Sequence, residues 1–256
     1  MTTHNSERTL FDCLSAIKNQ SYKPIDIIVS DNLSNDRTRE ISLPFTDRFY
    51  SNGPEGKIQR NFGASQATGE YLLFLDSDMI LSDSVVQDCI NQSEKGLYIP
   101  ERIKGQGFWI KVRNFERSFY NGTVIDAIRF VERESFIQIG GYDESLLGTQ
   151  DWDFDHRFRN LFPVGIVDSY LTHDESNFTL SNYLHKKQRW SDSFDSYKAK
   201  WNNDSEVRKQ FGAYYRLFGV FTEKGKWKRF LSHPILAISV LYLKFRVALA
   251  VKSKRQ

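Results

Sequence analysis

The chain of 256 residues, 40% hydrophobic, 14% aromatic and 26% charged, suits one α/β domain or a domain with a short appendage, which excludes a mainly disordered protein. Its two cysteines, Cys13 and Cys89, belong to no CxxC motif or Cys/His cluster, so neither a disulfide framework nor structural zinc is expected. The net charge of +3 hides an asymmetry, because residues 224–256 hold nine Lys or Arg and no acid. This distribution argues against nucleic-acid binding and favours contact with an anionic membrane surface.

Apolar runs alternate with amphipathic segments along the chain. Short apolar runs predict buried strands, and helical periodicity with capping residues predicts helices. The alternation indicates an α/β fold in which a mostly parallel sheet is flanked by helices. Helices are expected at residues 10–20, 36–41, 58–67, 84–93, 108–118 and 153–160 and before Gly140, and strands at 25–30, 48–50, 71–75, 96–100, 127–131 and 164–167.

Acidic residues follow two of these strands. The run 25–30 ends on Asp31, and the run 71–75 ends on Asp76-Ser77-Asp78. Ligands of open α/β sheets bind beyond the carboxyl ends of the strands, so both acidic ends should share one cleft. Carboxylates at the spacing of Asp76 and Asp78 can hold Mg²⁺ or Mn²⁺ and leave room for phosphate oxygens, with an acidic turn or helix cap as the alternative.

Several blocks, in order, carry a family resemblance. Residues 69–78, preceded by Arg60-Asn61-Phe62-Gly63, resemble the family 2 glycosyltransferases of GT-A fold. The likeness extends from about Thr3 to Trp190. The further matching blocks are Thr3-His4-Asn5, residues 13–20, residues 27–38, Gly140-Gly141-Tyr142-Asp143-Glu144 and Gln150-Asp151-Trp152-Asp153.

The resemblance implies a binding site for a nucleotide-sugar donor. Asp31 would contact the nucleotide base, with a turn residue that caps the next loop as the alternative. Asp76 and Asp78 would hold the donor diphosphate through Mn²⁺ or Mg²⁺, which stabilises the charge of the leaving group. The implied donor-binding residues in this region are Thr3, Asn5, Asp31, Arg60 and Asp76.

Asp151 matches the position of the family's catalytic base, which would deprotonate the acceptor hydroxyl. The family usually has Glu before this Asp, whereas Gln150 stands here and removes a like charge. Asp153 and Asp155 are the competing carboxylates; Asp155 is expected to be a solvated neighbour one turn further on, and Asp153 to point elsewhere. An acid favoured by the helix dipole is the alternative for Asp151.

Two further features complete the expected site. His173, in a loop after the last strand, would complete the metal shell or meet the diphosphate, with an ordinary loop histidine as the alternative. Lys187 and Arg189 would neutralise the diphosphate, with a solvated basic helix face as the alternative. Their segment departs from the QxxRW motif of processive relatives because Lys186 stands where Gln belongs, which argues against processive synthesis.

The chain divides into an expected GT-A domain at residues 1–200 and a helical, basic segment at residues 201–256. The apolar runs 234–243 and 247–251 are interrupted by Lys244 and Arg246, which favours an interfacial helix over a membrane span. A helix packed on the domain or a dimer contact are the alternatives. The cations expected to bind anionic lipid are Lys224, Lys226, Lys228, Arg229, Lys252, Lys254 and Arg255.

The expected function is that of an inverting, metal-dependent glycosyltransferase with a glycan or lipid-linked acceptor, peripheral at the cytoplasmic face of the cell membrane. The alternative is a catalytically impaired, nucleotide-sugar-binding protein of this fold, because only Met1-Thr2-Thr3 remains of the family's first, central strand. An upstream apolar segment of about five to seven residues is therefore expected, since unpaired buried backbone groups cost about 1 to 3 kcal/mol each. Nucleotidyl transfer shares the metal and diphosphate but would not require Asp151.

Overall fold

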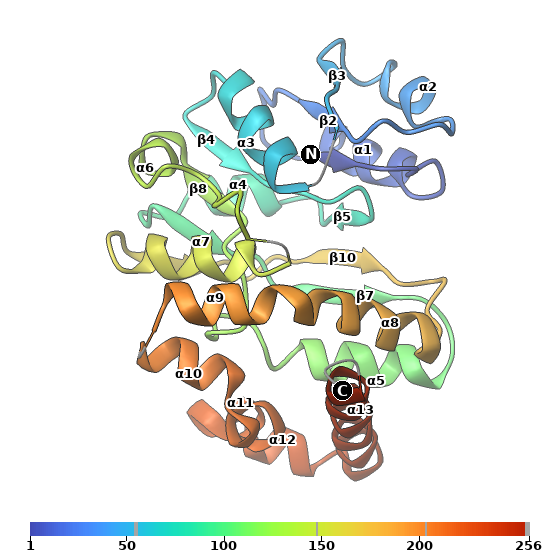
Figure 1. Cartoon of the computed structure of the whole chain (residues 1–256). Helices are drawn as coiled ribbons and strands as arrows, with labels where there is room; N and C mark the ends of the chain where they lie inside the picture. Colours follow the sequence, from blue (N-terminus) through green and yellow to red (C-terminus); the bar gives the residue numbers. More distant parts are fainter. Residues whose placement is uncertain (54–55, 147, 203, 254–256) are drawn as a thin grey trace.

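The computed structural model describes residues 1–53, 56–146, 148–202 and 204–253 and shows an α/β arrangement (Figure 1). The strands are β1 (Thr2–Thr3), β2 (Val29–Asp31), β3 (Phe49–Ser51), β4 (Tyr71–Leu73), β5 (Met79–Leu81), β6 (Gly96–Tyr98), β7 (Glu101–Lys104), β8 (Phe130–Glu132), β9 (Val164–Ile166) and β10 (Leu171–Asp174). The helices are α1 (Leu10–Lys18), α2 (Thr38–Ser42), α3 (Gly56–Gln66), α4 (Val85–Ile90), α5 (Phe108–Arg117), α6 (Arg133–Gln138), α7 (Gln150–Arg159), α8 (Leu180–Trp190), α9 (Phe194–Lys200), α10 (Ser205–Phe211), α11 (Val220–Thr222), α12 (Trp227–Leu231) and α13 (Pro234–Ser253).

The first sheet has the order β1-β2-β3 and is parallel, with Thr3 opposite Asp31. On its other side β1 contacts the chain that follows β4, where the Thr2 amide donates to the Leu75 carbonyl and Thr2 forms a parallel bridge with Asp76. The two acidic strand ends therefore lie at the same edge, one on each side of β1, as the sequence predicted.

The second sheet has the order β4-β8-β6-β9, and β8 runs antiparallel to both of its neighbours. Helix α1 covers the main core with an apolar stripe at helical spacing, Leu10, Cys13, Leu14 and Ile17, each at most 6% exposed. Both cysteines are buried free thiols that belong to this core. Across the described residues, four of the seven strand pairings are parallel.

A third sheet, β5-β10-β7, was not predicted by the sequence pattern. Its strands have three or four residues each, so they carry too few positions for a clear period-2 signal. The expectation that His173 lies in a loop is wrong, because it sits within β10, opposite Met79 of β5 and Ile103 of β7. This sheet brings His173 next to the turn that carries Asp78.

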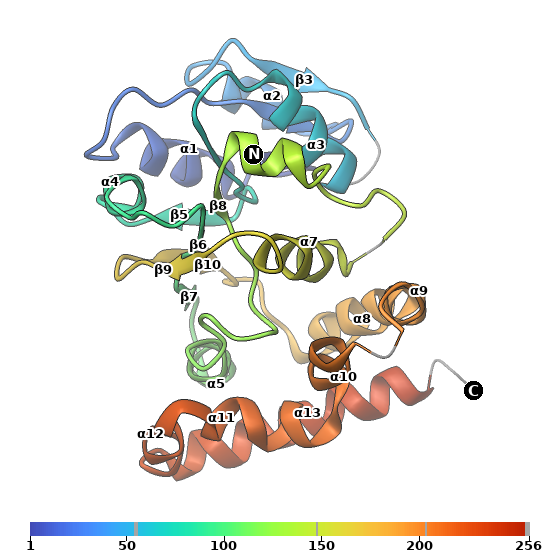
Figure 2. The same cartoon turned by 90° about the vertical axis from the view of Figure 1, so that its left-hand side faces the viewer.

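The C-terminal helices form a layer at the end of the molecule far from α1, α2 and α3 (Figure 2). Helix α13 buries Ala237, Val240 and Leu243 in a cluster that also contains residues of α5. Lys244, which interrupts the apolar run in the sequence, is an ion-pair partner of the buried Glu116 at 2.5 Å. One face of the C-terminal segment is therefore packed on the rest of the protein, which agrees with the alternative of a helix packed on the domain.

Candidate functional site

Arg60 of α3 joins two of the predicted site carboxylates. Its Nη2 donates to Asp76 Oδ1 at 2.8 Å, and its Nη1 donates to Asp151 Oδ1 at 2.7 Å. The Arg60 side chain is only 9% exposed, so its guanidinium group is largely shielded from water, whereas the side chains of Asp76 and Asp151 are 35% and 40% exposed. One guanidinium group thus holds together the end of β4 and the start of α7, although 91 residues separate Arg60 from Asp151.

The electrostatics of Asp76 reflect this cation. Burial by itself would raise the pKa of the Asp76 carboxyl, but the positive charges of Arg60 and Arg129 outweigh it, and the pKa lies well below its usual range. Thr2 Oγ1 also donates to Asp76 Oδ1, at 3.2 Å. Asp76 is therefore an anion at every pH at which the protein would work.

Asp151 differs from its two competitors on α7 by being accessible. Its side chain is 40% exposed, in the first turn of the helix as the sequence predicted. Asp153 is fully buried and accepts bonds from Arg157 and Trp201. The expectation of a solvated Asp155 is wrong, because Asp155 is also fully buried and accepts bonds from Tyr98 and Arg159. Of these three carboxylates, Asp151 alone can reach a substrate.

Asp78, which was expected to hold a metal ion together with Asp76, contacts His173. The His173 ring Nε2 lies 3.1 Å from Asp78 Oδ2, and its Nδ1 lies 3.8 Å from Glu101 Oε2. Burial would lower the pKa of His173, but the carboxylates of Asp78 and Glu101 raise it to about 9. At neutral pH His173 is thus an imidazolium that faces the acidic turn.

Asp78 and His173 could supply some of the ligands of a metal ion, but not a complete set. In the part of the chain that the structure describes, no three His, Cys, Asp or Glu side chains are grouped so that they could hold a metal ion. However, the buried Asp78 Oδ1 has no hydrogen-bond partner, which leaves one carboxylate oxygen free to coordinate a cation. Mg²⁺ typically binds through one or two carboxylates together with substrate phosphates, and this donor set is compatible with that pattern.

Asp31, the residue expected to contact the nucleotide base, lies beside Thr3 of β1, and Asn5 follows in the next loop. Asp31 is 1% exposed and accepts bonds from the hydroxyls of Thr3, Ser34 and Ser51 and from the Ser34 amide. Asn5 Oδ1 accepts from the Asn35 amide, which ties the two loops together. This is the arrangement of a turn cap, so a contact of Asp31 with the base stays a prediction.

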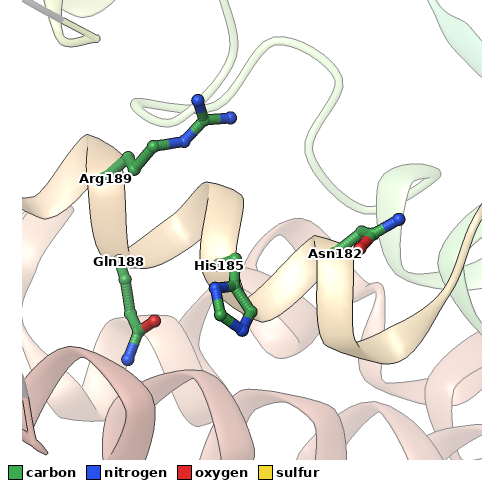
Figure 3. A pocket seen from close by; sticks show the side chains of 4 residues that line it. All are labelled: Asn182, His185, Gln188 and Arg189. Atoms are coloured by element: carbon green, nitrogen blue, oxygen red, sulfur yellow. The ribbon is translucent and has the colours of Figure 1, made fainter.

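Lys187 and Arg189, the cations expected to neutralise the diphosphate, belong to α8, which also carries Lys186. The Lys187 Nζ lies 4.2 Å from the Trp190 ring centre and 5.3 Å from that of Tyr183, and burial lowers the pKa of Lys187 well below its usual range. Arg189 lines a cavity of about 520 Å³ together with Asn182, His185 and Gln188, and Figure 3 shows Arg189 pointing away from the helix below. A diphosphate contact of either cation also stays a prediction.

Glu101, Asn61 and Arg129 also shape this site, although none of them was predicted as a site residue. Glu101 is buried and receives bonds from Arg117 and Arg129, whose charges outweigh the effect of burial and hold the pKa of Glu101 well below its usual range. Asn61 bonds both the amide and the carbonyl of Tyr142, which fixes the Gly140-Gly141-Tyr142 segment against α3. The signals in the sequence were an Arg at position 129, inside the predicted apolar run 127–131, and the place of Asn61 in the block that follows Arg60.

Comparisons with known proteins agree with this picture. The model of the family described as "Glycosyl transferase family 2" matches residues 1–141. The GalNAc(5)-diNAcBac-PP-undecaprenol beta-1,3-glucosyltransferase of Campylobacter jejuni is 31% identical over 104 residues, which are 37% of this chain and 33% of that protein. The UDP-Glc:alpha-D-GlcNAc-diphosphoundecaprenol beta-1,3-glucosyltransferase WfgD of Escherichia coli is 33% identical over 87 residues, which are 31% of this chain and 34% of that protein. The matched segments span about a third of the length of these curated relatives.

A solved structure resembles the chain along its whole length. The mannosyltransferase PcManGT from Pyrobaculum calidifontis, in complex with GDP-Man and Mn²⁺, superposes with a TM-score of 0.62 at 14% sequence identity. The match covers 100% of this chain and 86% of that one. At this identity the likeness shows a common fold.

Proposed function

Because the chain belongs to glycosyl transferase family 2 and has the GT-A fold, we propose that it transfers one sugar from a nucleotide-diphosphate sugar to a hydroxyl group of a glycan or lipid-linked acceptor, with inversion at the anomeric carbon. Two of its relatives carry undecaprenol-linked substrates in their names, which supports a lipid-linked acceptor. The contact that carries the proposal is the Arg60 bridge, because it holds Asp76 of the donor side next to the accessible Asp151.

In the proposed reaction Asp151 takes the proton of the acceptor hydroxyl. The acceptor oxygen then bonds to the anomeric carbon from the side opposite the leaving group, and the bond from that carbon to the phosphate oxygen breaks. The nucleoside diphosphate leaves with the electron pair. A positioned general base accelerates such a step by about 10²- to 10⁴-fold. The ion pair with Arg60 keeps Asp151 in position.

Asp78, together with His173, would hold a divalent cation on the donor diphosphate. When bound, Mn²⁺ or Mg²⁺ would supply electrostatic stabilisation of the charge that develops on the leaving phosphate. The solved mannosyltransferase is in complex with Mn²⁺, which supports the same cofactor here. As an imidazolium, His173 is suited to contact the diphosphate directly, and it would have to lose its proton to serve as a ligand.

We expect a cognate donor to stabilise the protein in the presence of Mn²⁺. At a donor concentration of about 100 Kd the gain in unfolding free energy is about 2.7 kcal/mol, which thermal unfolding detects readily. The measurement screens UDP- and GDP-sugars with Mn²⁺ and with EDTA, then follows transfer to sugars linked to undecaprenyl diphosphate. Stabilisation by a donor without transfer to any acceptor would favour the nucleotide-sugar-binding alternative, and no response to any donor would contradict the proposal.

The site would work at a membrane, and the exposed face of α13 supports this. Its apolar side chains recur at spacings of three and four residues, so they lie along one side of the helix. Trp227 and Leu231 of the neighbouring helix α12 are exposed as well, and residues 224–256 contain no acid that would repel anionic lipid. The exposed side chains of α13 are Ile235 (70%), Ile238 (68%), Tyr242 (44%), Phe245 (57%) and Leu249 (48%).

Helix α13 is long and apolar enough to cross a membrane, with a mean hydropathy of 1.8, but its contacts favour an interfacial position. A spanning helix would withdraw Val240 and Leu243 from the core and break the pair between Lys244 and Glu116. We therefore propose peripheral attachment to the cytoplasmic face of the cell membrane. Two of the cations expected to help, Lys254 and Arg255, lie outside the described residues.

Two substitutions on this face, Ile238→Gln and Phe245→Gln together, should weaken binding to vesicles that contain phosphatidylglycerol by about 10²- to 10⁴-fold, because each buried apolar side chain contributes about 1.5 to 3 kcal/mol. The matched control changes two equally exposed apolar residues elsewhere, Ile137→Gln and Leu161→Gln, which are 60% and 62% exposed. Salt should reduce binding of the unchanged chain only in part. Equal co-sedimentation of both double variants would contradict membrane attachment through α13. Deleting the helix would be a poorer test, since it belongs to the core.

A further inference from the structure

Four cationic side chains gather where α5 and α8 meet the C-terminal helices (Figure 1). This cationic cluster consists of Arg113 of α5, Lys187 of α8, Arg216 of the π-helical turn Tyr215–Gly219 and Lys244 of α13. The Arg113 guanidinium carbon and Lys187 Nζ lie 4.6 Å and 5.3 Å from the centre of the same ring, that of Tyr183. Burial lowers the pKa of Lys244, and the positive charges of Arg216 and Arg113 lower it further. The four charges therefore act on one another.

Two of the four cations have carboxylate partners. Glu116 pairs with Arg113 and, at 2.5 Å, with Lys244. Glu175, which directly follows β10, pairs with Arg113 at 2.9 Å. Burial by itself would raise the pKa of Glu116, but the charges of Lys244 and Arg113 outweigh it, and the pKa lies well below its usual range. These ion pairs join α5 to α13 and to the end of β10, so they hold the cationic cluster in place.

Lys187 and Arg216 have no such partner. Their side chains make no hydrogen bond or ion pair with the residues that the structure describes. Lys187 is half-buried, and burial together with the charge of Arg113 lowers its pKa well below the usual range. A buried charge without a partner is costly, whereas an anion beside Lys187 would favour the protonated amine. When Lys187 is protonated, four cations face two carboxylates, so a ligand with two negative charges would balance the cluster.

The cationic cluster lies between the helix of the candidate base and the exposed face of α13. Both views place α8 between α7 and α13 (Figure 1, Figure 2). The Arg216 guanidinium carbon lies 5.0 Å from the ring centre of Trp152, which directly follows Asp151 in α7. Lys244 directly precedes Phe245, one of the exposed apolar side chains of α13. One end of the cluster therefore adjoins the start of α7, and the other end adjoins the helix proposed to contact the membrane.

We propose that the cationic cluster binds the diphosphate group of a lipid-linked acceptor, an inference that rests on the proposed function. In such an acceptor the diphosphate stands between the sugar and the lipid, and its two ionised oxygens carry two negative charges. With the sugar at Asp151 and the lipid at the exposed face of α13, the diphosphate comes to lie where Lys187 and Arg216 are. Ammonium and guanidinium groups form charge-assisted hydrogen bonds with phosphate oxygens. Lys187 is thereby assigned to the acceptor, whereas the sequence suggested a contact with the donor diphosphate.

The test measures the binding of farnesyl diphosphate, a short lipid diphosphate, by calorimetric titration in EDTA, so that no metal ion holds it at the donor site. Lys187→Gln and Arg216→Gln each remove a cation without leaving a carboxylate unpaired, so both variants should fold with a nearly unchanged melting temperature. We expect each to weaken binding by about 10- to 100-fold, the scale of one hydrogen bond to a charged group. The matched control is Lys198→Gln on α9, because Lys198 also lies over an aromatic ring, 4.5 Å from the centre of Phe211. This control should bind like the unchanged chain.

Competition experiments separate the acceptor from other sources of phosphate. UDP with Mn²⁺ should not displace farnesyl diphosphate, and displacement would place the ligand in the donor site and overturn the proposal. Vesicles that contain phosphatidylglycerol should bind Lys187→Gln as well as they bind the unchanged chain. A loss of vesicle binding in this variant would indicate a membrane headgroup as the anion and would also overturn the proposal.

Transfer assays keep this inference distinct from the proposed function. Lys187→Gln should raise the KM for a lipid-linked acceptor and leave the Kd of the donor unchanged. Equal affinity of Lys187→Gln and Lys198→Gln for farnesyl diphosphate, or no binding by the unchanged chain, would refute the acceptor site even if sugar is transferred. A chain that binds farnesyl diphosphate through Lys187 but transfers no sugar would refute the proposed function and leave the anion site standing.

Discussion

Replacement of Asp151 by Asn should lower the turnover number by about 10²- to 10⁴-fold and leave donor affinity nearly unchanged, since a general base acts on the acceptor and not on the donor. The amide keeps the shape of the side chain and an oxygen for Arg60 Nη1, while Arg60 retains its pair with Asp76. Because the Asp151 side chain is 40% exposed, the fold should tolerate the loss of its charge. The measurement is steady-state kinetics together with donor titration of the same preparation.

Asp153→Asn is the matched control on the same helix. Asp153 is fully buried and paired with Arg157 and Lys200, so its substitution should lower the melting temperature and spare the turnover per folded molecule. If Asp153→Asn showed the selective loss of turnover and Asp151→Asn did not, the assignment of the base would be wrong.

Asp78→Asn should abolish the dependence of donor binding on Mn²⁺. A neutral amide is a weak ligand for a hard cation. Loss of a residue that only hydrogen-bonds to a metal ligand lowers metal affinity by about 10- to 100-fold, so loss of a direct ligand should lower it by at least as much. Calorimetric titration with UDP and GDP, with and without Mn²⁺, measures the effect. The same Mn²⁺-dependent affinity in the variant and the unchanged chain would contradict the metal assignment.

The same variant has a second readout that needs neither donor nor metal. Asp78 and Glu101 raise the pKa of His173 from 6.5 to about 9 in the folded chain, so protonated His173 contributes stability that is complete below pH 6.5 and is lost as the pH rises through about 9. In Asp78→Asn the pKa of His173 should fall, and the loss of stability over this range should become smaller. NMR titration of the His173 ring distinguishes a folded variant that lacks this pair from a misfolded one.

The main features that the sequence predicted are local. The stripe of Leu10, Cys13, Leu14 and Ile17 is a helical pattern within one segment, and α1 forms where it lies. The apolar runs that end on Asp31 and Asp76 could be placed at one edge because parallel strands share their carboxyl ends. Asp151 falls in the first turn of α7, and the family resemblance is confirmed by the match over residues 1–141.

The tertiary structure alone decided which charges meet. Arg60 binds Asp151 from 91 residues away. Glu101 lies beside Arg129 because the chain enters β7 soon after β6, and β6 pairs with β8, which Arg129 directly precedes. The tertiary structure also determines that Asp155 is buried while Asp151 is accessible, since burial of a carboxylate depends on neighbours such as Tyr98 rather than on helical spacing. Contacts of this kind depend on chain segments that are distant in sequence, and strands of three or four residues are formed by their partners more than by their own residues.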